Sequence, residues 1–148
     1  MKEKPRVLFV CVENACRSQM AEAFARFYAA NVLDAYSAGS NPSGKVNPDA
    51  VKVMQEVDID IAAQRSKSFR DLPIRDFDYI ITLGCHDVCP FVPGKRHIEW
   101  DIDDPKGKSL YFFREVREKI RRKVQNLIKG IIAEQDARKA PAAGTSAL

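Results

Sequence analysis

A cysteine and an arginine lie six positions apart in segment 11–18, which reads Cys-Val-Glu-Asn-Ala-Cys-Arg-Ser. Backbone N–H groups of a compact loop at the start of a helix form a cradle for an anion of phosphate size, and a guanidinium binds two of its oxygens at once. The same field favours thiolate over thiol at Cys11, and the Ser18 hydroxyl is close enough in sequence to donate to the sulfur. The segment therefore predicts a nucleophilic thiolate that faces an oxyanion held by Arg17.

The other residues of this loop are expected to bind the anion through their backbone. Asn14 has a short amide that bridges backbone groups and holds the loop's shape, although asparagine is also an ordinary residue of left-handed turns. Cys16 lies at the start of the next helix, where packing is favoured over the role of a resolving thiol. The predicted oxyanion-binding residues are Cys11, Val12, Glu13, Asn14, Ala15, Cys16 and Arg17.

A buried strand precedes the loop and an amphipathic helix follows it. Run 6–10 is rich in apolar and β-branched residues, as in a strand buried on both faces of a sheet. After the loop, Met20, Phe24, Phe27 and Tyr28 recur at helical spacing. An isolated cysteine is more often a small buried side chain than a nucleophile, but this strand–loop–helix context favours the nucleophile.

Strands and helices alternate along the rest of the chain. Short strands are expected at 35–38, 79–83 and 95–100. Asn47 is expected to cap one helix, and a long helix is expected to begin at Leu110. This alternation predicts an α/β fold in which right-handed crossovers connect parallel strands, with ligands bound at the carboxyl ends of the strands.

Three reactive side chains are expected at that edge of the sheet. Cys11 directly follows the first strand, Cys85 follows the third after two residues, and Asp104 follows the fourth after four. Cys89 supplies a second thiol near Cys85, with His86 between them. A zinc site built on these ligands is an alternative, but neither cysteine pair has the usual spacing of two residues. We therefore expect no metal and no other cofactor.

The composition is that of one globular domain of 148 residues, with 45% hydrophobic and 30% charged residues. Run 7–12 is too short to span a bilayer or to serve as a signal core, so a cytoplasmic protein with no membrane partner is expected. The net charge of +4 arises from segment 114–139, which is typical of a solvated helix face and not of a nucleic-acid site. We expect a single catalytic domain over 1–138 and a flexible tail over 139–148.

Segment 7–18, followed by Gln-Met-Ala-Glu at 19–22, resembles the low-molecular-weight protein tyrosine phosphatase family. Within that family it is most similar to the thioredoxin-coupled arsenate reductases. The resemblance covers about residues 5–132. It implies a flavodoxin-like fold with a four-stranded parallel sheet and helices on both faces.

The resemblance also implies roles for individual residues. Cys11 is implied as the nucleophile, Arg17 as the oxyanion ligand, and Asp104 of the Asp-Pro pair as the general acid. A carboxylic acid facing the anion protonates the departing oxygen, and the following proline restrains the aspartate backbone. Sequence alone would also allow Asp101 or Asp103 in this role.

Two activities share such a loop, and the second thiol pair favours a reductase. Arsenate reduction requires two electrons, which Cys85 and Cys89 can deliver through successive disulfides after arsenate has formed an adduct on Cys11. The expected partners are arsenate or a phosphate-like oxyanion, and thioredoxin or a similar dithiol reductant. The alternative is a protein tyrosine or small-phosphoester phosphatase that uses Cys11, Arg17 and Asp104.

Other positions bear on the same choice. The resemblance includes a potassium site at Asn14, Glu22 and Ser37, but Lys67 takes the place of its aspartate, so no potassium requirement is expected. Lys106 replaces the aromatic residue that usually follows Asp-Pro in the phosphatases, which favours the reductase. Gly84 before Cys85, and the gap of four residues to Cys89, depart from the best-known thioredoxin-coupled reductases.

Overall fold

The structure is a computed structural model that describes residues 4–84 and 94–139. Its elements, in chain order, are β1 (Arg6–Cys11), α1 (Arg17–Ala29), β2 (Asp34–Gly39), α2 (Pro48–Gln55), the 3-10 helix η1 (Phe69–Asp71), β3 (Phe77–Leu83), β4 (Gly94–Trp100) and α3 (Leu110–Lys139). Cys85, His86 and Cys89 lie outside the described residues. So does the expected tail, apart from Lys139 at the end of α3.

The four strands form one parallel sheet in the order β2-β1-β3-β4. Residues 7–9 of β1 are fully buried, because this strand lies inside the sheet and has both faces covered. β1 pairs with β2 as far as Cys11 opposite Gly39, and with β3 as far as Val10 opposite Thr82. The carboxyl ends of the strands therefore meet at one edge. This strand order confirms the expected flavodoxin-like fold.

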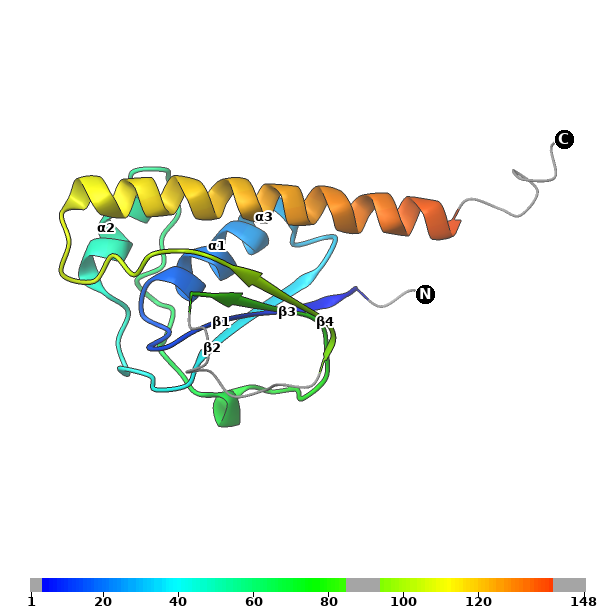
Figure 1. Ribbon diagram of the computed structural model, residues 1–148, viewed down its shortest axis with the longest axis horizontal. Coiled ribbons are helices and arrows are strands. Elements are labelled where there is room, and N and C mark those ends of the chain that lie inside the picture. The colour runs from blue at the N-terminus through cyan, green and yellow to red at the C-terminus, as the bar shows by residue number, and fades with distance from the viewer. Residues whose placement is uncertain (1–3, 85–93, 140–148) are drawn as a thin grey trace, which may run out of the picture.

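Alternate side chains of β1 enter two separate apolar clusters, one on each face of the sheet. Phe9 belongs to the larger cluster, which α1 and α3 cover with Phe24 and Phe113 (Figure 1). Leu8 belongs to the smaller cluster on the opposite face, where Phe69 of η1 packs against it. Helices therefore cover both faces, as expected, although the cover on the second face is a single short 3-10 turn among the described residues.

The apolar pattern of α1 is only partly buried. Met20 and Phe24 are fully buried, whereas Phe27 is 59% exposed and Tyr28 is 38% exposed. The rings of Phe24 and Tyr28 stack, and Phe27 meets Tyr28 edge-on. Residue spacing gives the direction of a side chain around a helix, but it does not show how far along the helix the neighbouring elements pack against it. The last turn of α1 is therefore more exposed than its periodicity indicates.

α3 has 30 residues and is about 45 Å long. Phe113, Ile120 and Val124 lie on its buried side, as expected from their spacing. Charged residues cover much of the rest of the helix. No helix within the described ranges is both long enough and apolar enough to cross a bilayer.

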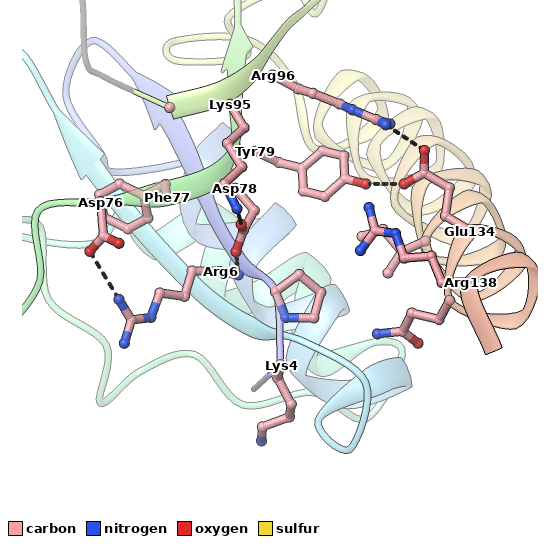
Figure 2. Close-up of a pocket in the computed structure, with 14 residues that line it drawn as sticks. Lys4, Arg6, Asp76, Phe77, Asp78, Tyr79, Lys95, Arg96, Glu134 and Arg138 are labelled. Carbon is pink, nitrogen blue, oxygen red and sulfur yellow. Dashed lines mark hydrogen bonds and ion pairs between the residues drawn. The ribbon is translucent and has the colours of Figure 1, made fainter. Parts of the chain in front are cut away.

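The C-terminal half of α3 crosses the amino ends of β3 and β4. The Tyr79 hydroxyl donates to Glu134 at 2.8 Å, and Arg96 forms an ion pair with the same carboxylate at 2.5 Å (Figure 2). A cavity of about 520 Å³ lies among these residues, at the end of the sheet opposite Cys11. Its other charged pairs are Arg6–Asp76 and Lys95–Asp78. Glu134 thus fastens the C-terminal part of α3 to β3 and β4.

A single carboxylate connects the end of α2 to α3. Glu56 accepts hydrogen bonds from Arg114 Nε at 3.0 Å and Nη2 at 2.8 Å, and from Arg117 Nη1 at 2.8 Å. The hydrogen bonds from Arg114 are the main cause that lowers the pKa of Glu56 from 4.5 to about 2. Between about pH 2 and pH 4.5, Glu56 is therefore ionised in the folded chain, whereas in the unfolded chain its carboxyl group is still largely protonated.

We expect Glu56→Gln to lower the thermal midpoint at pH 7 by a few degrees. Since the folded pKa lies below the unfolded one, the carboxylate stabilises the fold above about pH 4.5 and loses this effect as the pH falls toward 2. The variant should therefore show a shallower loss of stability over that range when unfolding is followed by circular dichroism. Glu115→Gln, on an exposed part of α3, is the control. An unchanged pH profile for Glu56→Gln would contradict the assignment.

Candidate active site

The loop between β1 and α1 lies at the carboxyl edge of the sheet. Cys11 is the last residue of β1 and Arg17 is the first residue of α1, and both are buried, at 2% and 5% exposure. The predicted strand, loop and helix are thus present, and they bring the thiol and the guanidinium to the same edge.

The carbonyl groups of the loop turn outward. Their hydrogen bonds are Val12 O with Asn41 N, Glu13 O with Ser43 N and Ser66 Oγ, Asn14 O with Gln19 Nε2, and Ala15 O with Asn47 N. In a planar trans peptide the N–H points opposite to the carbonyl of the same unit. The N–H groups of residues 13–16 are therefore directed toward the centre of the loop, where a tetrahedral anion would accept from them.

Two donors approach the sulfur of Cys11. The Ser18 hydroxyl lies 2.9 Å from Sγ, and the Ser18 backbone N–H donates to Sγ at 3.4 Å. Asn14 Nδ2 donates to Ser18 Oγ at 2.7 Å, which directs the hydroxyl hydrogen toward the sulfur. This is the hydrogen-bond arrangement that a thiolate nucleophile needs.

The side chain of Asn14 holds the loop in place. It is fully buried, and its φ of 51° is in the left-handed region. Its Oδ1 accepts from Gln19 Nε2 and from the backbone N–H of Lys67, both at 2.9 Å. Gly39 on β2 makes room for this turn, because a Cβ there would lie 2.6 Å from Val12 O and 2.9 Å from Asn14 N. Asn14 thus combines the two roles considered for it, an amide bridge and a left-handed turn.

Within the described residues, the guanidinium of Arg17 is held by the segment that follows β4. Its Nη1 donates to the Ile102 carbonyl at 3.1 Å, and its Nη2 lies 3.8 Å from Asp104 Oδ2. Its Nε is buried and has no hydrogen-bond partner within the described residues. A buried donor without a partner costs about 1–3 kcal/mol. An oxyanion in the loop would remove that cost by accepting from this group.

Gly84 makes the position of Arg17 possible. Its φ is +81°, and a Cβ at this position would lie 2.4 Å from the Ile102 carbonyl oxygen and 2.5 Å from Arg17 Nη1. A side chain here would displace the guanidinium. Gly84, which separates β3 from Cys85 in the sequence, therefore provides the space that the Arg17 guanidinium occupies.

Asp104 is the aspartate that faces the loop. Besides its contact with Arg17, its Oδ1 accepts from the backbone N–H of Lys106 at 3.0 Å, and its side chain is 51% exposed. In the described part of the chain, the side chains of Asp101 and Asp103 make no hydrogen bond or ion pair. The geometry thus favours Asp104 among the three acids that the sequence allowed.

Cys16 is buried next to the loop and is chemically quiet. Burial is the main cause that raises the pKa of its thiol to about 12, and the neighbouring Asp104 and Cys11 act in the same direction. A thiol with this pKa stays protonated at neutral pH and attacks poorly. The packing role favoured for Cys16 agrees with this environment.

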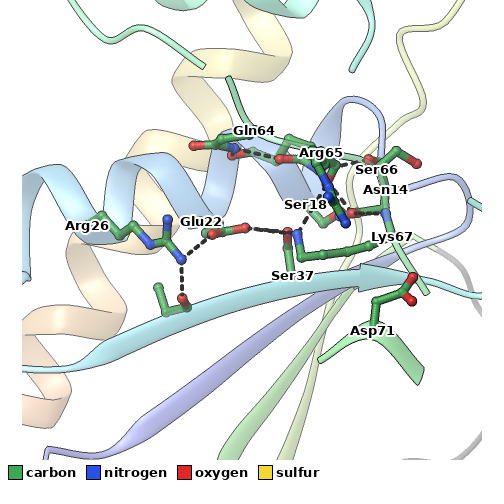
Figure 3. Close-up of polar contacts among 12 residues, drawn as sticks. Asn14, Ser18, Glu22, Arg26, Ser37, Gln64, Arg65, Ser66, Lys67 and Asp71 are labelled. Atoms are coloured by element: carbon green, nitrogen blue, oxygen red, sulfur yellow. Dashed lines mark hydrogen bonds and ion pairs between the residues drawn. The ribbon is translucent and has the colours of Figure 1, made fainter. Parts of the chain in front are cut away.

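A charge cluster around the buried carboxylate of Glu22 lies next to the loop. Lys67 Nζ lies 3.3 Å from Ser37 Oγ and 3.8 Å from Glu22 Oε1, and Ser37 donates to the same carboxylate (Figure 3). Arg26 pairs with Glu22 at 2.6 Å. Burial lowers the pKa of Lys67. The lysine ammonium thus lies where the resemblance expects a potassium ion.

The candidate zinc ligands of the second thiol pair, Cys85, His86 and Cys89, lie outside the described residues. Among residues 4–84 and 94–139, no three His, Cys, Asp or Glu side chains are grouped in a way that could hold a metal.

Several residues that shape the site were not identified from the sequence. Neither the close approach of the loop at Gly39 nor the packing role of Gly84 is predicted from the sequence. Both glycines directly follow or end a strand, which is a known sign of close backbone approach. The ion pair between Glu13 and Lys106, at 2.8 Å, joins residues 93 positions apart and has no local signal.

Comparisons with known proteins agree with this geometry. Residues 6–137 match the family described as low molecular weight phosphotyrosine protein phosphatase. An arsenate reductase of Bacillus cereus (strain 03BB102) is 40% identical over 84% of this chain and 95% of its own length. A glutaredoxin arsenate reductase of Synechocystis sp. is 40% identical over 85% of this chain and 98% of its own.

Solved structures give the same result. An arsenate reductase in the phosphate binding state superposes with a TM-score of 0.77 at 39% identity, over 86% of this chain and 98% of that one. A thioredoxin-dependent arsenate reductase of Corynebacterium glutamicum gives 0.75 at 35% identity, over 90% of this chain and 64% of that one. With its oxyanion loop, its parallel sheet and these relatives, the chain belongs to the low molecular weight phosphotyrosine protein phosphatase family.

Proposed function

We propose that this protein reduces arsenate to arsenite. The observation that carries the proposal is the pairing of a sulfur that receives two donors with a buried guanidinium that has an unused N–H group. Cys11 and Arg17 supply these groups within one loop. Relatives about 40% identical over most of the chain are named arsenate reductases, which supports arsenate as the substrate.

The first step is attack by Cys11 on bound arsenate. The Sγ–As bond forms as an As–O bond breaks, and Asp104 gives its proton to the departing hydroxyl, which leaves as water. Arg17 and the N–H groups of the loop stabilise the charge on the remaining oxygens. The contact between Asp104 and Arg17 keeps the acid beside the anion.

The next steps move two electrons to arsenic. Cys85 attacks the sulfur of Cys11, the S–As electron pair stays on arsenic, and arsenite leaves while a Cys11–Cys85 disulfide forms. Cys89 then attacks Cys85, which frees Cys11 and leaves a Cys85–Cys89 disulfide. This exchange requires the Cα atoms of each pair to come within roughly 4.4–6.8 Å. The assignment of Cys85 and Cys89 rests on the sequence.

An external dithiol completes the cycle by reducing the Cys85–Cys89 disulfide. Thioredoxin or a similar dithiol protein is proposed, because one relative is named a glutaredoxin arsenate reductase and another a thioredoxin-dependent one. The relay works only where thiols are kept reduced, so we place the protein in the cytoplasm.

The second candidate function is hydrolysis of a phosphotyrosine or a small phosphoester. The family match favours it, since the family is described by that activity. Cys11, Arg17 and Asp104 would serve as nucleophile, anion ligand and acid. The distinction lies in the second thiol pair, which hydrolysis does not require.

Cysteine variants separate the two functions. With arsenate, thioredoxin, thioredoxin reductase and NADPH, wild type should consume NADPH, and Cys11→Ser, Cys85→Ser and Cys89→Ser should fall to background, because each removes one sulfur of the relay. Hydrolysis of para-nitrophenyl phosphate is measured in parallel. If Cys85→Ser and Cys89→Ser reduce arsenate like wild type, the relay is wrong. Efficient hydrolysis of the ester by wild type and both variants would favour the phosphatase.

Potassium should have no effect on wild type. Arsenate reduction and thermal midpoint should be equal in KCl and choline chloride at the same ionic strength, because the Lys67 ammonium already balances Glu22. Lys67→Asp places a second carboxylate there, so its midpoint should fall by several degrees and recover partly in KCl. Lys45→Asp, at an exposed loop position, controls for the charge change. A strong potassium dependence of wild type would contradict the role given to Lys67.

A further inference from the structure

One ion pair joins the oxyanion loop to the loop that carries Asp104. Lys106 Nζ lies 2.8 Å from Glu13 Oε2. The two side chains are 57% and 32% exposed, so the contact lies on the solvent side of the buried sulfur and guanidinium. We call this contact the Glu13–Lys106 bridge.

Both ends of the bridge are fixed by further contacts. The Glu13 carbonyl accepts from Ser66 Oγ at 2.7 Å and from Ser43 N at 3.2 Å, so its backbone cannot drift. At the other end, the backbone N–H of Lys106 donates to Asp104 Oδ1 at 3.0 Å. Lys106 therefore orients the carboxylate through its backbone and fastens the same loop to residue 13 through its side chain.

The charges place the bridge close to the reacting groups. The hydrogen bond from Lys106 to Glu13 raises the pKa of the lysine, and Asp104 and Cys16 act on it in the same direction. At neutral pH, where Cys16 is uncharged, the lysine thus lies in the field of Glu13 and Asp104. Asp104 Oδ2 in turn faces Arg17 Nη2. The bridge and the acid are both partly exposed, whereas the side chain of Arg17 is buried.

The position of the departing oxygen gives this arrangement a chemical meaning. Asp104 protonates the oxygen that leaves, so that oxygen lies beside Asp104. In arsenate this oxygen carries only hydrogen. In a phosphomonoester the same oxygen carries the organic group, which must extend from Asp104 toward solvent. The Glu13–Lys106 bridge is partly exposed and is joined to Asp104 through the Lys106 N–H, so an organic group that extends from Asp104 toward solvent would pass close to it.

We infer that the Glu13–Lys106 bridge positions Asp104 and restricts the site to oxyanions without an organic group. Resting on the proposed function, the inference makes Lys106 a positioning and specificity-determining residue for arsenate over phosphomonoesters. An exposed ion pair contributes little to folding stability. Loss of the bridge should therefore change selectivity while the fold stays intact.

The test compares kcat and KM for arsenate reduction and para-nitrophenyl phosphate hydrolysis in Lys106→Met, Glu13→Gln and the double charge exchange Glu13→Lys/Lys106→Glu. Each single variant should lower kcat for arsenate by about tenfold with little change in KM, because the acid is held less well. Each should also raise kcat/KM for the aryl ester. The exchange variant restores an ion pair of opposite sense and should recover much of the wild-type selectivity.

Lys108→Met is the matched control, since Lys108 is an exposed lysine of the same loop whose ammonium lies over the Phe112 ring. It should keep both activities. Lys106→Arg should also keep them, which shows that charge and reach matter more than one particular side chain. Thermal unfolding of each variant checks that the fold is intact.

The outcomes are distinct. A ratio of ester to arsenate activity in Lys106→Met equal to that of wild type overturns the inference, as does a charge exchange no better than the single variants. If wild type does not reduce arsenate, the proposed function fails, but the bridge is still tested. In that case Lys106→Met should raise ester hydrolysis while the inhibition constant of inorganic phosphate stays the same, and a parallel change in both would overturn the bridge.

Discussion

The site depends on the outward orientation of four consecutive carbonyl groups. Each has its own donor. The carbonyl of Asn14 accepts from Gln19 in the helix that follows, and the other three accept from segments that are distant in the sequence. Because peptide units are rigid, fixing the carbonyls fixes the opposite N–H groups toward the centre of the loop. Asn14 adds its buried amide to this frame, and Gly39 leaves the space that the turn requires. The loop is therefore preorganised before any anion binds.

The same frame explains why Arg17 can remain partly unsatisfied. Its guanidinium is pinned by the Ile102 carbonyl and fitted over Gly84, so it cannot turn to find another acceptor for Nε. The free energy lost at this donor is offset by the packing of α1 and the sheet around it. The free-energy cost of the unpaired Arg17 Nε would be removed by an anion that accepts from it, and unpaired buried donors of this kind are typical of functional sites.

Local patterns predicted most of the fold and part of the site. The strand before Cys11 and the helix after it follow from apolar spacing, and the convergence at one edge follows from parallel strands. Residue patterns alone leave Asp104 equal to its acidic neighbours, and only the resemblance to the Asp-Pro pattern selects it. The contact with Arg17 that supports this choice depends on packing. The Glu13–Lys106 bridge joins loops that have no shared periodicity, so no window of sequence contains it. The exposure of Phe27 likewise depends on how far along α1 the neighbouring elements pack against it.

The two ends of the sheet are built for different purposes. At the amino ends of β3 and β4, Glu134 accepts from both Tyr79 and Arg96, so these polar groups hold α3 in place. At the carboxyl ends, the buried Arg17 Nε lacks an acceptor within the described residues. Folding alone would favour satisfying both ends equally. Arg121 Nε, near the Phe24 ring, also lacks a partner within the described residues. What distinguishes Arg17 is that its free N–H group adjoins the loop of Cys11, where an oxyanion would accept from it.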